Sequence, residues 1–352
     1  MAFHLGVLRY LAQHSALEQV DHISSVSGGS LLVGLILQQN GMLWPGSERF
    51  MSFSLPTMRA KLCESSLQWA AARRLFNPLN WRFAFSRANL LSLALQHEWG
   101  VRSRLADIPP NPVWSINGTT AETGKRFRFK ADSIGDYVMG TAKAGNFPLA
   151  NALAVSAAFP GGFGPLTLKT RKMDWQRRSS WGAPAESASP VEPMYPRVHL
   201  YDGGVYDNLG LEPFFDAGEG APKVQDKFIL VSDASAPLPA GFSYLALNPW
   251  RLKRVADIMS DQARSLRVRT FVSYLKRQPA AGAYVSIGTK TKEGIVQTEA
   301  SHPARFPTTL RRLTLAEFDK LVDHGHQVAR VVHHEFEMAG LHQPSQSMEA
   351  GE

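Results

Sequence analysis

Apolar positions near the start of the chain follow first a helical and then a strand-like spacing. A helix over residues 2–13 is predicted by apolar side chains at near-helical intervals, namely Phe3, Leu5, Leu8, Leu11 and Ala12. A short apolar run at 20–26 and a longer one at 31–37 follow. They predict a strand, a sharp turn and a second helix over 28–39, which ends at Asn40-Gly41.

The rest of the chain alternates between strand and helix patterns. Residues 44–104 are rich in Leu, Ala, Phe and Trp, and we expect an irregular helical region there. Strands are predicted at 112–117, 125–129, 198–201, 228–231 and 283–287, and helices at 249–276 and 314–338. The polar segment 171–197 is expected to be an exposed insertion, and 341–352 a disordered tail. This alternation favours an α/β sandwich with one antiparallel hairpin.

Composition and charge narrow the class of protein. The longest uninterrupted apolar run, Leu31–Leu37, is far shorter than the ~20 residues that span a bilayer. No signal peptide is visible, so we expect a cytoplasmic location. The net charge is +8, but the basic residues are spread without interleaved aromatic residues, so we expect no nucleic-acid partner. Either a solvated basic surface or peripheral contact with an anionic membrane explains the charge.

The strongest chemical candidate is Ser27, in the stretch Ser24-Ser25-Val26-Ser27-Gly28-Gly29-Ser30. A serine between a strand and a helix is held at the tip of a sharp turn, beside the first N–H groups of the helix. This placement predicts a nucleophile of an acyl hydrolase. Ser25 stands where the G-x-S-x-G motif has its first glycine, and we expect this small residue to fit.

A serine nucleophile needs a base, and the sequence offers two kinds. The late histidines at 324, 326, 333 and 334 lie on a predicted helix, and too little chain precedes Ser27 for a triad hydrolase, so we discount them. Asp202 follows a strand and precedes Gly203-Gly204, which permit a tight turn and a close approach of another segment. Partial burial would raise its pKa and strengthen it as a base; the alternative is an aspartate that merely closes a turn.

Taken together, these motifs resemble the patatin-like phospholipases, in particular their bacterial branch. The matching stretches are His4-Leu5-Gly6-Val7-Leu8, Val26-Ser27-Gly28-Gly29-Ser30, Ser156-Ala157-Ala158-Phe159-Pro160 with Phe163 and Pro165, and Asp202-Gly203-Gly204 with Asp207-Asn208. The resemblance implies a three-layer α/β/α sandwich, with a central, mostly parallel sheet and helices on both faces. Residues 1–215 would form the catalytic domain, and residues 216–340 an α/β continuation packed on the same sheet.

The resemblance also implies a mechanism. Ser27 would be the nucleophile and Asp202 the general base of a Ser–Asp dyad that acts through an acyl-enzyme, with Gly29, Gly203 and Gly204 supporting the motif. The substrates would be phospholipids or other acyl-ester lipids, and neither a metal nor an organic cofactor is implied. The Ser156–Pro165 stretch would be structural. The alternative function is a catalytically inactive, basic, peripheral membrane-binding protein on the same scaffold.

One departure from the family concerns the oxyanion hole. Members of the family carry a glycine-rich loop, G-G-G-x-R-G, after their first strand, and its N–H groups bind the oxyanion. Here no glycine trio precedes Phe3, which leaves only the Gly28 N–H as a partial donor. We expect the sequence to be truncated before this strand and loop; the alternative is a degenerate, weakly active member. A missing donor costs about 10²–10³ in rate.

Overall fold

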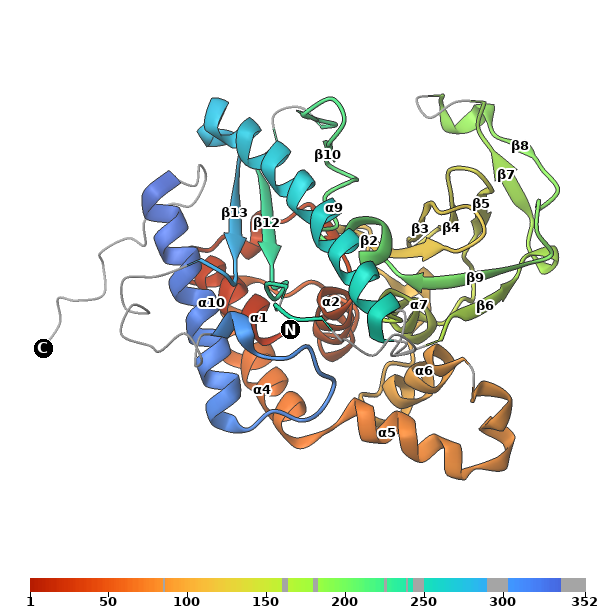
Figure 1. Ribbon diagram of the computed structural model, residues 1–352, viewed down its shortest axis with the longest axis horizontal. Coiled ribbons are helices and arrows are strands. Elements are labelled where there is room, and N and C mark those ends of the chain that lie inside the picture. Colours follow the sequence, from red (N-terminus) through yellow and green to blue (C-terminus); the bar gives the residue numbers. More distant parts are fainter. Residues whose placement is uncertain are drawn as a thin grey trace, which may run out of the picture.

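The computed structural model describes residues 1–84, 86–159, 164–179, 183–224, 227–238, 240–242, 250–289 and 303–336 (Figure 1). The larger helices are α1 (Ala2–Gln13), α2 (Gly28–Gln39), α4 (Leu55–Glu64), α5 (Leu67–Arg73), α6 (Arg87–Glu98), α7 (Leu149–Ser156), α9 (Trp250–Arg277) and α10 (Leu315–Phe336). Single turns form α3 (Ser47–Arg49) and α8 (Gly204–Asp207). None of these helices is long and apolar enough to cross a bilayer.

Most strands belong to one large sheet. The described residues form a nine-stranded sheet in the order β6-β9-β2-β3-β4-β5-β7-β8, with β1 paired to β2. Its strands are β1 (His22–Ser25), β2 (Val113–Thr120), β3 (Arg126–Phe129), β4 (Ser133–Asp136), β5 (Gly140–Lys143), β6 (Leu166–Lys169), β7 (Trp175–Arg177), β8 (Ser189–Pro190) and β9 (Arg197–Asp202). Two small sheets pair β10 (Phe215–Asp216) with β11 (Ala221–Pro222), and β12 (Ile229–Asp233) with β13 (Gly282–Ser286).

The α/β class is confirmed, but the expectation of a mostly parallel sheet is wrong. Among the described strands, only β1–β2 and β12–β13 pair in parallel. The pairs β2–β3, β3–β4 and β4–β5 are antiparallel because these strands follow one another through turns of a few residues. A parallel pair needs a crossover of a dozen residues or more, which these short turns cannot provide.

Two segments differ in detail from the sequence interpretation. Segment 171–197 is largely exposed, but it also supplies β7 and β8 to the edge of the large sheet. In the segment 216–340, β12 and β13 pair with each other and with no described strand of the large sheet. That segment therefore does not extend the large sheet, and joins it through a shared apolar core that includes Val285 and Phe318. The tail at 341–352 lies outside the described residues.

Helix α1 lies directly against α10, and glycines make this contact close. A Cβ at Gly6 would lie 2.0 Å from the Val322 carbonyl oxygen, and one at Gly325 would lie 2.1 Å from the Phe3 carbonyl oxygen. Only glycine leaves room for backbones this near. Helix α10 also contacts β13, so α1 is held beside the β12–β13 pair (Figure 1).

Candidate active site

The site is built around a strained turn between β1 and α2. Ser27 has φ +51° and ψ −124°, a conformation that non-glycine residues rarely adopt and that costs about 1–3 kcal/mol. Helix α2 begins at the next residue, Gly28, whose N–H is the first of the helix and has no acceptor within it. The turn therefore presents the serine beside an N–H group at the positive end of α2, as the sequence predicts.

A chain of buried hydroxyl groups holds this turn. The Trp114 indole N–H donates to Ser25 Oγ at 2.8 Å, and Ser25 Oγ lies 2.8 Å from Ser30 Oγ. Ser30 Oγ lies 2.8 Å from Ser156 Oγ, which also accepts the Ser27 N–H at 3.1 Å. Ser25 thus fits the position at which the G-x-S-x-G motif has a glycine. Through Ser30 and Ser156, its hydroxyl group also links the turn to α7. Sequence reasoning missed the parts that Ser30 and Trp114 play, although both stand next to predicted motifs.

Asp202 lies at the end of β9, opposite Gly118 of β2, and its carboxyl group meets Ser27. The side chain is buried, with 2 % of its surface exposed. Burial raises the pKa of Asp202 to about 7, whereas hydrogen bonds from the Gly204 N–H and the Ser27 side chain act to lower it. The Gly204 N–H lies 2.7 Å from Oδ1. The structure therefore brings the side chains of the two sequence-predicted residues together.

The two glycines after Asp202 are required by close contacts. A Cβ at Gly203 would lie 2.5 Å from the Asn117 carbonyl oxygen, and one at Gly204 would lie 2.6 Å from Asn208 Oδ1. At Gly29, by contrast, the nearest atom would be 3.9 Å away, an ordinary contact. Gly203 and Gly204 thus let β9 turn against β2, whereas packing does not demand glycine at position 29.

Asn117, in the middle of β2, was not singled out from the sequence. Its amide donates to Ser24 Oγ and to the Ser25 carbonyl oxygen, each at 2.9 Å. These bonds fix the end of β1 just before the turn. The sequence gives little signal for this role, because the same strand also contains Ser115, Thr119 and Thr120.

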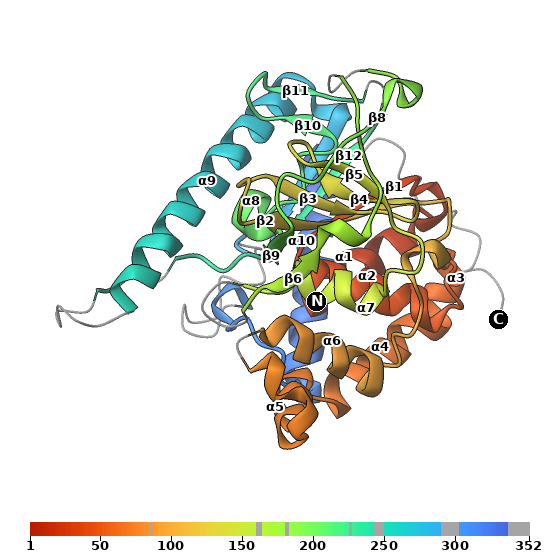
Figure 2. The ribbon, with the colours of Figure 1, turned by 90° about the vertical axis from the view of Figure 1, so that its right-hand side faces the viewer.

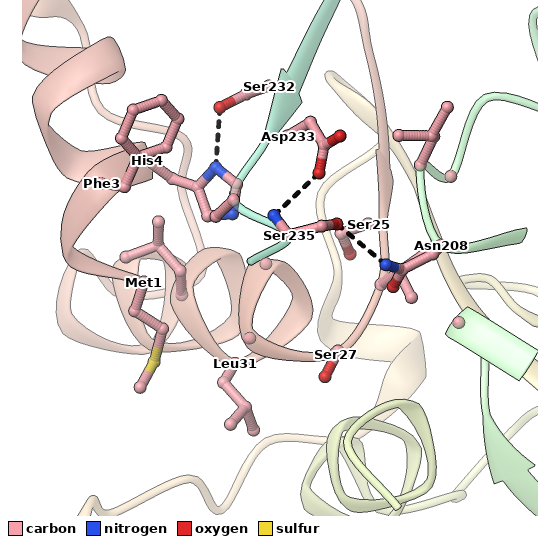
Figure 3. A pocket seen from close by; sticks show the side chains of 18 of the residues that line it. Met1, Phe3, His4, Ser25, Ser27, Leu31, Asn208, Ser232, Asp233 and Ser235 are labelled. Atoms are coloured by element: carbon pink, nitrogen blue, oxygen red, sulfur yellow. Dashed lines mark hydrogen bonds between the residues drawn. The ribbon is translucent and has the colours of Figure 1, made fainter. Parts of the chain in front are cut away.

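A cavity of about 1440 Å³ opens beside the Ser27–Asp202 pair (Figure 3). It runs between β1 and β12, which each pair with a neighbour on one side only among the described strands. Lys227 and Asp21, which precede these two strands, form an ion pair across it. Apolar side chains that line the cavity include Val7, Leu8, Leu11, Leu31, Leu32, Leu62, Leu90 and Phe214. Its size and lining suit an acyl chain.

A second polar cluster faces the cavity from the end of β12. Asp233 Oδ2 accepts hydrogen bonds from Arg264 at 2.9 Å and from the Tyr284 hydroxyl at 2.7 Å. Close by, His4 Nδ1 lies 2.7 Å from Ser232 Oγ (Figure 3). Burial lowers the pKa of His4 to about 3, so its ring is neutral. Because Arg264 belongs to α9, this cluster ties α9 to β12 and β13.

The late histidines lie away from Ser27. His324 Nε2 bonds the Ile287 carbonyl oxygen at 2.8 Å, His326 bonds Gln13 at 2.6 Å, and His333 bonds Tyr10 at 2.7 Å. These contacts pack α10 on its neighbours, and none of these three histidines lines the cavity. Within the described ranges, no group of three or more His, Cys, Asp or Glu side chains is placed to hold a metal ion.

Comparison with known families agrees with this architecture. The family model for patatin-like phospholipase matches residues 1–215. The chain therefore belongs to the patatin-like phospholipase family. The matched range holds both Ser27 and Asp202. A search of curated proteins found no match.

Solved structures with a similar fold include human GIVD cytosolic phospholipase A2. Its complex with methyl gamma-linolenyl fluorophosphonate is 15% identical, with a TM-score of 0.49, and the match covers 94% of this chain and 55% of that one. The structure described without that inhibitor is 14% identical, with the same TM-score of 0.49, and the match covers 94% and 59% of the two chains. The chain thus spans little more than half the length of these structures.

Proposed function

We propose that the protein is a serine lipid acyl hydrolase that uses Ser27 as nucleophile and Asp202 as general base. The observation that carries this proposal is that the side chain of a serine on a strained turn lies beside a buried carboxyl group. An isolated serine hydroxyl is a poor nucleophile, and an adjacent base corrects this. The apolar cavity beside the pair gives room for the acyl chain of a phospholipid or another acyl-ester lipid.

The proposed reaction has two steps. Ser27 Oγ attacks the ester carbonyl carbon while Asp202 takes the hydroxyl proton; the ester C–O bond then breaks, and the alcohol leaves with that proton. Water then attacks the acyl-enzyme, with Asp202 again as base, and the fatty acid leaves as Ser27 recovers its proton. A base whose pKa lies near 7 is well matched to both transfers at neutral pH.

Stabilisation of the oxyanion is the weak part of the proposed site. We assign the Gly28 N–H as one donor, because it is the first amide of α2 and adjoins Ser27. In the family, a glycine-rich backbone segment supplies further N–H donors to the oxyanion, and such a segment would lie between β1 and β12. Met1 lies beside Gly28 in this part of the cavity. Each absent donor lowers the rate by about 10²–10³.

Covalent labelling tests the proposal directly. A fluorophosphonate should label the protein at Ser27, with the label located by peptide mass spectrometry. Ser27→Ala should remove labelling, and Asp202→Asn should slow it by about 10²–10⁴, the usual contribution of a general base. Ser232→Ala is the matched control, because Ser232 is also in the cavity and bonds a histidine. Labelling at Ser232 would contradict the assignment, and absence of any label would favour the non-catalytic membrane-binding alternative.

A further inference from the structure

A group of large apolar side chains lies exposed on α5 and on the turns that follow it. The exposed fractions are 67% for Trp69, 86% for Phe76, 76% for Leu79 and 65% for Trp81. Single exposed apolar residues are ordinary, but four within one short stretch form a patch that marks an interaction site. Together with the neighbouring arginines we define the cap surface as Trp69, Arg73, Phe76, Leu79, Trp81 and Arg82.

The cap surface stands on ordered backbone. Helix α5 buries Leu67, Ala70 and Ala71, and it packs against α6. The turns that follow are held by side chains: the Leu79 N–H donates to Asn77 Oδ1 at 3.0 Å, and the Asn80 amide donates to the Arg74 carbonyl oxygen at 2.8 Å. The fold thus displays these apolar side chains to solvent, although it buries the other side of the same segment.

Basic side chains outnumber acidic ones around this patch. From Ser65 to His97 the sequence contains no aspartate and no glutamate. The Arg73 side chain is 64% exposed and forms an ion pair with Glu98 at 3.6 Å, and Arg74 lies 3.7 Å from the same carboxylate. The Arg82 guanidinium stacks over the Phe83 ring, 4.7 Å from its centre. Aromatic and aliphatic side chains beside a surplus of arginines match the boundary between headgroups and acyl chains of an anionic leaflet.

The same segment forms part of the cavity wall. Residues of the same segment line the cavity beside Ser27: Gln68 directly precedes Trp69, and Ala71, Ala72 and Leu75 lie between residues of the cap surface. Figures 1 and 2 both show α5 and the turns after it at the lower tip of the molecule. A flat surface that touches this tip would therefore face the cavity wall formed by α5.

We propose that the cap surface docks on an anionic phospholipid bilayer. Phe76, Leu79 and the two indoles enter the headgroup–acyl boundary, and Arg73 and Arg82 contact lipid phosphates. Docking sets the α5 wall of the cavity against the leaflet, so that an acyl chain passes to Ser27 without crossing water. The purpose of docking rests on the proposed function, but the binding itself does not.

Vesicle binding tests the proposal on the full chain. Two double variants remove the apolar and the charged contributions: Phe76→Ser with Leu79→Ser, and Arg73→Gln with Arg82→Gln. Each should lower the partition coefficient onto vesicles of phosphatidylcholine with about 30 mol% phosphatidylglycerol by about tenfold or more. Matched controls at other exposed positions, Leu43→Ser with Met194→Ser and Arg171→Gln with Lys172→Gln, should change it less than twofold.

Further readouts separate docking from chemistry and from folding. Both cap variants should keep the wild-type rate of fluorophosphonate labelling, and Ser27→Ala should bind vesicles like the wild type. Nitroxide-labelled lipids should quench tryptophan fluorescence in the wild type and in Ser27→Ala. Equal vesicle binding by the wild type and both cap variants would overturn the proposal. It would also be overturned if the wild type did not bind vesicles but formed a dimer that the cap substitutions abolish. Vesicle binding without labelling would refute the proposed function alone.

Discussion

At the scale of single residues, the site depends on two side chains in costly states. Ser27 has a strained backbone, and Asp202 is a carboxyl group almost without solvent. Neither state is stable by itself, so the surroundings must hold both. Hydrogen bonds through Ser156 and Ser30 hold the turn, and the Gly204 N–H holds the carboxyl group. Such costs are typical of functional sites.

The raised pKa of Asp202 predicts how reactivity depends on pH. Asp202 can act as a base only when its carboxyl group is ionised. The pKa of an aspartate in water is near 4, whereas burial raises the pKa of Asp202 to about 7. Labelling should therefore rise about tenfold per pH unit below pH 6 and level off above pH 8. The measurement is the second-order rate constant of fluorophosphonate labelling from pH 5 to 9. A constant rate over this range, with the fold intact by circular dichroism, would contradict the assigned base.

At the scale of elements, the contact between α1 and α10 positions one wall of the cavity. Helix α1 contributes His4 and Val7 to that wall, Met1 adjoins them just before the helix, and Gly6 faces the backbone of α10. The backbone atoms of α10 cannot move aside as a flexible side chain would. Substitutions in this contact should therefore affect both stability and the site.

Gly6→Ala should destabilise the protein by about 1–3 kcal/mol, the usual cost of overpacking. The added Cβ would lie 2.0 Å from the Val322 carbonyl oxygen, and the helix propensity of alanine offsets only about 1 kcal/mol. Equilibrium unfolding in urea measures the change. Gly288→Ala is the control, since its Cβ would lie 3.6 Å from the nearest atom, Ser286 Oγ. Equal free energies of unfolding for the two variants would show that the helices can separate without cost.

At the scale of the whole molecule, the cavity separates the edges of two sheets. The large sheet ends at β1 on one side of it, and the β12–β13 pair stands on the other, with α1 beside them. A molecule in this cavity would touch both sheets at once. Its binding energy would therefore contribute to the stability of the whole fold rather than of one segment.

A lipid with a long acyl chain should raise the melting temperature of the Ser27→Ala variant. We use this variant because we expect it to bind the lipid without hydrolysing it. At 100 times its dissociation constant, a ligand adds about 2.7 kcal/mol, or about 3–4 °C for a chain of this length. Differential scanning calorimetry with monomeric lysophosphatidylcholine measures the shift. Glycerophosphocholine, which has the headgroup without the chain, should cause none. An equal shift with both compounds would assign the cavity to the headgroup.

Much of the local structure follows from the sequence. The apolar spacing predicts α1, α2, α9 and α10, and the apolar runs predict β9, β12 and β13, within a few residues of their bounds. These elements are set by the side chains they contain, so a local pattern suffices. The strand–turn–helix around Ser27 is local in the same sense, which is why the candidate nucleophile can be found from sequence alone.

Pairing and environment were decided only by the tertiary structure. Strand direction depended on connection lengths between β2 and β5, and the pattern of apolar residues does not report it. The sequence indicated Asp202 as a candidate base, but its contact with Ser27 and its raised pKa arise from segments far apart that bury it together. The same holds for the Ser25–Ser30–Ser156 chain and for the exposed cap surface. Burial is a property of the packed molecule, so a sequence motif can name a reactive group but cannot determine its surroundings.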